Sequence, residues 1–264
     1  MLEQILYPAI IIGAIGLFFG ALLAFASIIF KVEKDDRIDK IAEILPGANC
    51  GGCGCAGCSA FAESIVNNGA RITKCNLITE DKAEKIASIM GMEAGKIIRK
   101  KATVTCSGTC ESCQNKCETY GITDCYSASQ LGNGIKNCEY GCIGLGSCVK
   151  VCPTGAIEIK NGISEINSEK CIGCGKCASA CPKKVIQIIP EKRTAAVKCM
   201  SKDKGIIVKK YCSAGCIGCK ICEKKCPKDA IHVIDNLARV DYDKCVGCGI
   251  CVKECPKQVI ELIK

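Results

Sequence analysis

Cysteine is the residue type whose number and spacing in this chain point to chemistry. The 264 residues include 28 cysteines, many of them in runs of four that end in Cys-Pro. The run C-x2-C-x2-C-x3-C-P occurs three times, at Cys171, Cys174, Cys177 and Cys181, at Cys216, Cys219, Cys222 and Cys226, and at Cys245, Cys248, Cys251 and Cys255. This spacing is typical of the thiolate ligands of [4Fe–4S] clusters, which carry electrons.

Ligands are expected to be exchanged between neighbouring runs. In proteins with two such clusters, the first three cysteines of a run hold one cluster and the fourth ligates the other. The second half of the chain then provides two sets, Cys216, Cys219, Cys222 with Cys255, and Cys245, Cys248, Cys251 with Cys226. In the first half, Cys152 is expected to complete the set of Cys171, Cys174 and Cys177.

A second set in the first half lacks one ligand. The sequence that begins at Cys152 is repeated, with substitutions, in the sequence that begins at Cys226. Three ligands are in place at Cys142, Cys148 and Cys181, but Leu145 stands at the position that matches Cys219. We expect Cys138 to supply the missing thiolate. A sixth set then remains, consisting of Cys106, Cys125, Cys199 and Cys212, of which Cys125 and Cys199 are separated by the same offset as the two repeats.

A different cysteine loop lies nearer the N-terminus. It reads CGGCGCAGC from Cys50 to Cys58, and Cys75 follows later in the chain. Glycine permits the tight turns that wrap a backbone around a cluster. We expect Cys50, Cys53, Cys58 and Cys75 to form one set of four ligands, which leaves Cys55 unused.

The run Cys110, Cys113 and Cys117 is not needed by any of these sets. A seventh cluster or a zinc site is one interpretation of this run, and free or redox-sensitive thiols are the other. The sequence therefore predicts about six [4Fe–4S] clusters, within a range of about five to seven.

Disulfides and zinc are the competing explanations for so many cysteines. Disulfides are most frequent in short secreted chains, and zinc sites commonly include histidine, of which His232 is the single example. The formal net charge of +9 counts cysteines as neutral. Six clusters of about −2 each change that charge to about −3. The charge therefore does not indicate a nucleic-acid partner.

The ligands must be positioned by a mixed α+β fold. Short alternations of apolar residues follow each Cys-Pro, at 156–159, 185–188, 230–233 and 259–262, and predict paired strands that close two tandem ferredoxin units, each with two clusters. Around the first cysteine loop, helices are expected over 38–45 and 59–67, and from the capping residue Thr79 to Gly91. The expected domains are an anchor at 1–30, an iron–sulfur module at 31–100, a cysteine-rich segment with the first ferredoxin unit at 101–190, and the second unit at 191–264.

An uncharged apolar stretch from Tyr7 to Phe30 is long enough to cross a bilayer as a helix. Glu3 precedes it, while Lys31, Lys34, Arg37 and Lys40 follow it. The positive-inside rule then predicts a single-pass protein of the cell membrane with most of the chain on the cytoplasmic side. A signal peptide cleaved after Ala26 is the alternative, although the start lacks basic residues.

The order of these parts resembles the B subunit of the Rnf complex. The likeness includes the loop LPGANCGGCGCAGCSAFAESI and the stretch YGITDCYSASQLGNGIKNCEYGCIGLGSCVKVCP. Rnf is a membrane-bound ferredoxin:NAD oxidoreductase that couples electron transfer to Na+ or H+ translocation. The resemblance implies that reduced ferredoxin donates electrons to this subunit, which relays them to flavin and membrane subunits. Departures from the family are Cys55, the run from Cys110 to Cys117, and Asn76 with Leu77.

The chain shows no G-x-G-x-x-G loop after an expected strand, no P-loop and no C-x-x-C-H haem motif. Nucleotide chemistry is therefore expected on another subunit, and this chain is expected to act in an enzyme only as part of the complex. An electron-transfer subunit of a membrane hydrogenase or other reductase, and a zinc-stabilised scaffold, are the alternatives.

Basic residues are concentrated between Lys192 and Lys228. This segment has eleven Lys or Arg against Asp203 and Glu223, a net charge of 11 − 2 = +9. One interpretation is a docking site for an acidic ferredoxin. The other is a solvated lysine face that compensates the charge of the clusters.

Overall fold

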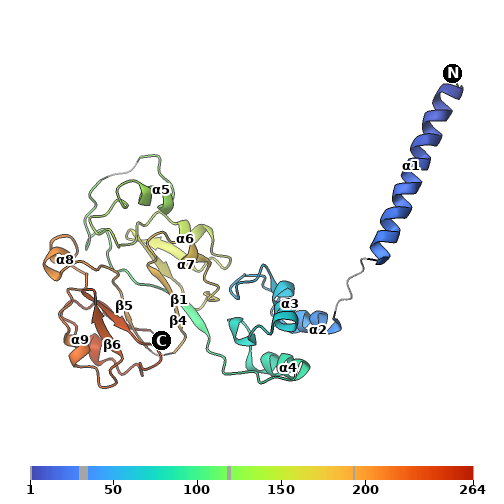
Figure 1. The fold of residues 1–264 in the computed structure, drawn as a ribbon. Helices are drawn as coiled ribbons and strands as arrows, with labels where there is room; N and C mark the ends of the chain where they lie inside the picture. Colours follow the sequence, from blue (N-terminus) through green and yellow to red (C-terminus); the bar gives the residue numbers. More distant parts are fainter. Residues whose placement is uncertain (1, 30–34, 118–119, 193, 264) are drawn as a thin grey trace.

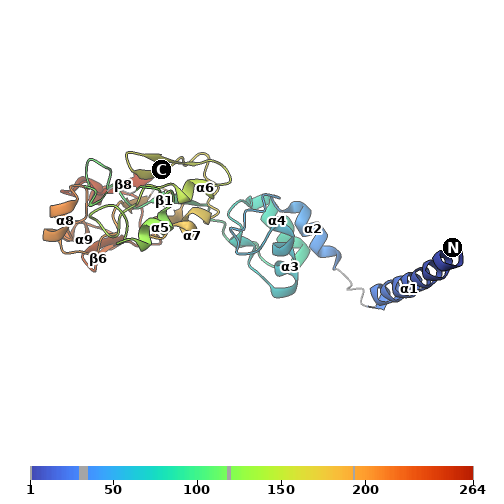
Figure 2. The same ribbon diagram turned by 90° about the horizontal axis from the view of Figure 1, so that it is seen from above.

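The computed structural model describes residues 2–29, 35–117, 120–192 and 194–263. These residues form a long N-terminal helix, a small helical module and two units built of short strands, short helices and loops (Figures 1 and 2). The predicted mixture of helices and strands is confirmed.

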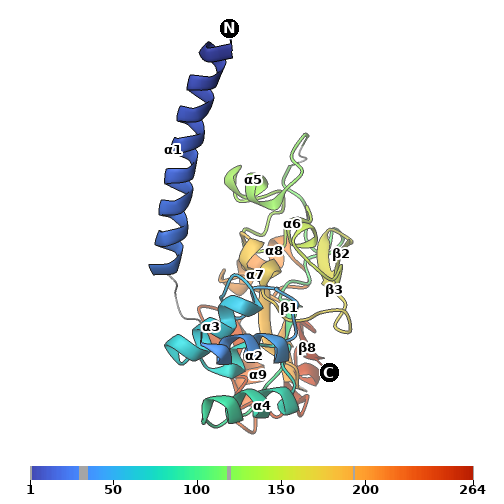
Figure 3. The same cartoon turned by 90° about the vertical axis from the view of Figure 1, so that its right-hand side faces the viewer.

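Helix α1 (Leu2–Ile29) stands apart from the other elements (Figures 1 and 3). Its described apolar side chains are exposed, for example Ile12 and Leu17 with exposed fractions of 70 % and 78 %. Across the described residues, no helix combines the length and the apolar character that crossing a membrane requires. Phe30, Lys31 and Lys34, which contribute to the prediction of a span and its orientation, lie outside the described residues.

The helical module consists of α2 (Asp36–Ile44), α3 (Cys58–Asn68), the 3-10 turn Ile72–Lys74 and α4 (Glu80–Met90). Its core includes Ile41, Phe61, Ile65 and Ile86, all almost fully buried. Burial of these side chains from three helices gives the module a hydrophobic core of its own. The three predicted helices are confirmed to within two residues at their ends, although Thr79 makes no side-chain capping bond.

The first ferredoxin unit contains two antiparallel pairs of strands. β1 (Lys100–Val104) pairs with β4 (Ile186–Pro190), and β2 (Ile157–Lys160) pairs with β3 (Ile163–Ile166). Helices α6 (Ser147–Lys150) and α7 (Lys176–Ala180) pack against each other. Helix α5 (Cys125–Gln130) lies in a long segment between β1 and α6.

The second unit repeats this arrangement. β5 (Thr194–Val197) pairs with β8 (Ile260–Ile263), and β6 (Ile231–Ile234) pairs with β7 (Leu237–Val240). Helices α9 (Ile221–Lys224) and α10 (Ile250–Lys253) pack against each other, and α8 (Gly205–Tyr211) precedes them.

The strand registers show which positions of the two units correspond. Val104 faces Ile186 and Val197 faces Ile260, and these two isoleucines occupy matching positions of the sequence repeat. Thr105 and Lys198, the next residues, donate equivalent backbone bonds of 2.7 Å to Val185 and Val259. Cys106 and Cys199, which follow directly, are therefore structural equivalents.

The four strands predicted after the Cys-Pro pairs are confirmed, and each is paired. Their partners are β1, β3, β5 and β7, which the apolar alternation after Cys-Pro did not mark. The hairpins β2–β3 and β6–β7 turn through Asn161-Gly162 and Asp235-Asn236, where both residues have positive φ. Such turns favour two-residue hairpins, so β2 and β6 find their partners in the segment that follows. β1 and β5, the partners of β4 and β8, come from segments before the cysteine runs.

Candidate iron–sulfur sites

Both thiol sets expected in the second unit surround cavities. Cys216, Cys219, Cys222 and Cys255 line about 340 Å³ of space that no protein atom fills. Cys226, Cys245, Cys248 and Cys251 line about 380 Å³. In each set the fourth thiol comes from the other cysteine run. The structure thus brings the four thiols of each expected set to one cavity.

The structure places Cys125 beside the thiols of the irregular set of the first unit. This residue lines about 320 Å³ of unfilled space together with Cys142, Cys148 and Cys181. Its backbone N–H donates to Ser147 Oγ at 2.8 Å, and Leu145 packs against the small buried cluster that contains Cys125. Leu145 stands at the sequence position that matches Cys219 and provides no thiol, while helix α5 brings the thiol of Cys125 to this cavity.

Cys138, the residue expected in that set, lies in a different group. It lines a cavity with Cys106, Cys113, Cys199 and Cys212. Cys125 and Cys138 thus lie at each other's expected places. Cys113 joins the group that contains Cys106, Cys199 and Cys212. The offset between Cys125 and Cys199 does not reflect structural equivalence, because the residue equivalent to Cys199 is Cys106.

The remaining set expected in the first unit consists of Cys152, Cys171, Cys174 and Cys177. Part of it lies close to the irregular set. Cys177 lies near enough to Cys171, Cys174 and Cys148 for their charges to interact. The sulfur of Cys152 accepts the N–H of Ala156 at 3.3 Å, and the equivalent sulfur of Cys226 accepts the N–H of Ala230 at the same distance. Backbone N–H groups aimed at sulfur stabilise thiolate charge at such sites.

The glycine-rich loop brings together part of the set predicted there. Cys75 lies close enough to Cys53 and Cys50 for their charges to interact. Cys58 begins α3, and its N–H donates to Asn49 Oδ1 at 2.8 Å. Cys55 lies beside Cys53 and forms a hydrogen bond with it. Cys110 and Cys117 are exposed.

Burial governs the protonation of the thiols that line the cavities. Desolvation, followed by the charges of neighbouring cysteines, raises the pKa of Cys177 to about 12, and burial likewise raises the pKa of Cys222 to about 12. A thiolate at these positions therefore requires a compensating cation. Iron ions held by these thiols would supply that positive charge.

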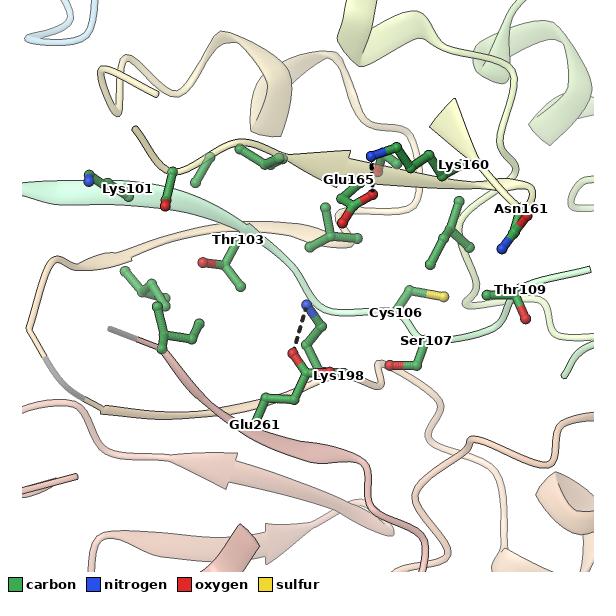
Figure 4. A pocket seen from close by; sticks show the side chains of 18 of the residues that line it. Lys101, Thr103, Cys106, Ser107, Thr109, Lys160, Asn161, Glu165, Lys198 and Glu261 are labelled. Atoms are coloured by element: carbon green, nitrogen blue, oxygen red, sulfur yellow. Dashed lines mark ion pairs between the residues drawn. The ribbon is translucent and has the colours of Figure 1, made fainter. Parts of the chain in front are cut away.

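A wider cavity of about 1340 Å³, part of it open to solvent, separates the two ferredoxin units (Figure 4). Lysines and glutamates from the strands around it form ion pairs, including Lys198 with Glu261 at 3.5 Å and Lys160 with Glu165 at 3.1 Å. Cys106 is the cysteine among its lining residues. The pairing of its charges distinguishes this cavity from the cysteine-lined ones.

The thiol-lined cavities fit polynuclear clusters. Each is lined by four or more thiols, and cysteine provides the sulfur ligands that iron–sulfur clusters require. Within the described part of the chain, no three His, Cys, Asp or Glu side chains are grouped so as to hold a single metal ion.

Four regions of the chain match known iron–sulfur families. Residues 45–76 match a family described as a putative Fe–S cluster. Residues 134–182, 170–230 and 215–260 match families described as 4Fe–4S dicluster domains. These matches agree with the glycine-rich loop and the two tandem units.

Relatives of this chain carry explicit names. The B subunit of the Na+-translocating ferredoxin:NAD+ oxidoreductase complex of Acetobacterium woodii is 47 % identical over 245 residues, which cover 92 % of this chain and 74 % of the relative. The B subunit of the ion-translocating oxidoreductase complex of Methanosarcina acetivorans is 41 % identical, and 89 % of each chain is covered. The corresponding subunit of the proton-translocating complex of Clostridium ljungdahlii is 41 % identical over 91 % of this chain and 85 % of the relative.

This chain belongs to the family of Rnf B subunits. Together with the dicluster domains, membership makes it the iron–sulfur electron-transfer subunit of an Rnf complex. The Rnf relatives named above come from complexes described as translocating sodium ions, unspecified ions and protons.

Proposed function

We propose that this subunit takes electrons from reduced ferredoxin and carries them through cysteine-bound [4Fe–4S] clusters toward the flavin and membrane subunits of its complex. Each cluster accepts or donates one electron when bound. Five sets of cysteines hold these clusters: Cys50, Cys53, Cys58 and Cys75; Cys152, Cys171, Cys174 and Cys177; Cys125, Cys142, Cys148 and Cys181; Cys216, Cys219, Cys222 and Cys255; and Cys226, Cys245, Cys248 and Cys251.

The succession of thiol sets across the protein is the observation that carries this proposal. The glycine-rich loop touches the first ferredoxin unit, since a Cβ on Gly52 would lie 3.1 Å from Cys174 Cα. Within that unit Cys177 neighbours Cys148, and in the second unit Cys222 and Cys251 belong to one buried cluster of side chains. The glycine-rich loop is therefore in contact with the first unit, and within each unit the two sets are close to each other.

The second ferredoxin unit is the entry point for electrons in this proposal. Its Cys219 and Cys248 are exposed at the protein surface. Lys209 and Lys210 on α8 and the neighbouring Lys224 and Lys225 are exposed as well. A positive surface next to accessible thiolates suits an acidic donor protein, because complementary charge accelerates encounter.

Helix α1 serves as a membrane anchor in this proposal, with the remainder of the chain in the cytoplasm. The sequence from Gln4 to Phe30 has no charged residue, and described apolar side chains such as Leu17 and Leu23 are exposed. A bilayer would cover this surface without a protein partner. The complex as a whole is the enzyme, a translocase that couples this electron flow to ion transport.

Mixing the anaerobically purified full-length protein with reduced ferredoxin tests the proposal. Visible absorbance of the clusters should bleach within the mixing experiment as ferredoxin becomes oxidised. Oxidised ferredoxin serves as the control and should cause no bleaching. Persistence of the full cluster absorbance in the presence of excess reduced ferredoxin would contradict the assignment of the donor.

A further inference from the structure

Five thiols meet between the two ferredoxin units. They line a cavity with about 320 Å³ of unfilled space and are Cys106, Cys113, Cys138, Cys199 and Cys212. The cavity has the same volume as the one lined by the irregular set of the first unit. Cys106 and Cys113 lie outside all four regions that match iron–sulfur families.

Four of these thiols are two pairs of equivalent positions. Cys106 and Cys199 follow β1 and β5 at the same point of the strand register. Cys138 and Cys212 occupy matching positions of the sequence repeat. A Cβ on Gly141 would lie 3.5 Å from Cys138 Cβ, and one on the equivalent Gly215 would lie 3.7 Å from Cys212 Cβ. Each unit thus contributes two thiols from the same two places, as expected for one bound group that is held between two related units.

Backbone donors point at the sulfur atoms of this group. Cys106 Sγ accepts the N–H groups of Gly108 and Cys142, both at 3.4 Å. The N–H of Cys216 forms a hydrogen bond with the sulfur of Cys199. These bonds stabilise negative charge on sulfur and are one of the means by which proteins tune iron–sulfur clusters.

A buried lysine adds positive charge to the same cavity. Lys136 is 3 % exposed and lines the cavity. Its ammonium donates to the carbonyl oxygens of Gly108 at 2.6 Å and Gly162 at 2.7 Å. Among the described residues, no carboxylate lies within 4.0 Å of this ammonium. A buried charge needs a counter-charge, and an anionic cluster beside Lys136 would provide one.

We propose that Cys106, Cys138, Cys199 and Cys212 hold a further [4Fe–4S] cluster between the two ferredoxin units. Cys113 is the fifth thiol and faces Cys212 across an isolated antiparallel bridge. The inference rests on the proposed function, because it assigns the site that joins the two halves of the electron path. Hydrogen bonds on both sides support this role. The sulfur of Cys106 accepts the N–H of Cys142 in the first unit, and the sulfur of Cys199 accepts the N–H of Cys216 in the second.

Iron and acid-labile sulfide, counted in anaerobically purified full-length protein, test the proposal. The variants Cys138→Ser and Cys212→Ser should each contain about four irons fewer than the parent protein. Cys117→Ser is the matched control, because Cys117 is exposed and lines none of the thiol cavities described above, and it should keep the parent's iron content. Parent-like iron content in both Cys138→Ser and Cys212→Ser would overturn the proposal.

The iron content of the parent protein separates this inference from the proposed function and does not depend on the folding of a variant. About 24 irons per chain are expected with the additional cluster and about 20 without it. A parent with about 20 irons that is still bleached by reduced ferredoxin would remove only the cluster between the units. A parent without iron would remove the proposed function as well.

Discussion

The side-chain amide of Asn76 donates a hydrogen bond to the backbone carbonyl of Ile172 at 2.8 Å. The same side chain donates to the Lys100 carbonyl at 2.7 Å and accepts the Lys100 N–H at 2.6 Å. Asn76 directly follows Cys75, and Ile172 directly follows Cys171. One side chain therefore holds the iron–sulfur module against the first ferredoxin unit at the point where their thiol sets approach each other.

Replacing Asn76 should loosen this junction without removing a cluster. Asn76→Ala removes three hydrogen bonds, each worth about 1 kcal/mol. We expect faster hydrogen exchange at the Lys100 amide, with unchanged iron content, as measured by exchange mass spectrometry. Asn67→Ala, on the exposed part of α3, is the control. Equal protection of Lys100 in both variants would show that Asn76 does not hold the junction.

A methyl group at Gly173 should disrupt the same junction. Gly173 has φ of +66°, and its added Cβ would collide with the Lys100 carbonyl oxygen and Asn76 Nδ2. Gly155 has a similar φ of +60° with no atom within 4 Å of an added Cβ. We therefore expect Gly173→Ala to lower the midpoint of thermal unfolding more than Gly155→Ala. A larger loss in Gly155→Ala would contradict this explanation.

Cys125 should be essential for one cluster of the first unit, and its loss should be reparable. Cys125→Ser is expected to lose about four irons. Adding Leu145→Cys places a thiol at the position equivalent to Cys219 and should restore them. The double variant is compared with Cys125→Ser by iron analysis and by electron paramagnetic resonance of the reduced protein. Full iron content in Cys125→Ser would assign the ligand elsewhere.

The sequence predicted which thiols of the regular runs meet at one cavity, because this grouping depends on local spacing. The runs from Cys216 to Cys226 and from Cys245 to Cys255 exchange their fourth thiols as proline-terminated runs imply. The irregular set was not predictable in this way. Cys125 reaches its cavity on α5, within a long segment between β1 and α6 that the second unit replaces by a shorter one. An offset measured across segments of different length does not pair equivalent residues, so Cys106 rather than Cys125 corresponds to Cys199.

The pairing of the strands was likewise not predictable from the local sequence pattern. Apolar alternation marked the strands after each Cys-Pro, but β1 and β5 pair with β4 and β8, which lie much further along the chain. Such distant pairing is a tertiary event that local pattern does not encode. Cys106 and Cys199 follow these two strands, and for that reason the thiol group between the units became visible only in the fold.

Reversing charge on the second unit should slow electron uptake. Lys209, Lys210, Lys224 and Lys225 are exposed, and changing them to Glu removes attraction for an acidic ferredoxin. The rate of ferredoxin oxidation should fall most at low salt, because added salt screens charge over about 10 Å at 0.1 M.

The matched control for this experiment carries the same change of charge on the iron–sulfur module. It replaces four exposed lysines, Lys40, Lys74, Lys85 and Lys96, by Glu. Stopped-flow bleaching at several salt concentrations compares the two variants. Similar rates in both would show that docking does not depend on the second unit.

Counting iron, acid-labile sulfide and zinc in the anaerobically purified full-length protein tests the central claim most directly. Cysteine-bound [4Fe–4S] clusters predict a brown protein with about 20 to 24 irons per chain, an equal amount of sulfide and negligible zinc. A colourless protein whose cysteines are joined as disulfides or bound to zinc would contradict it.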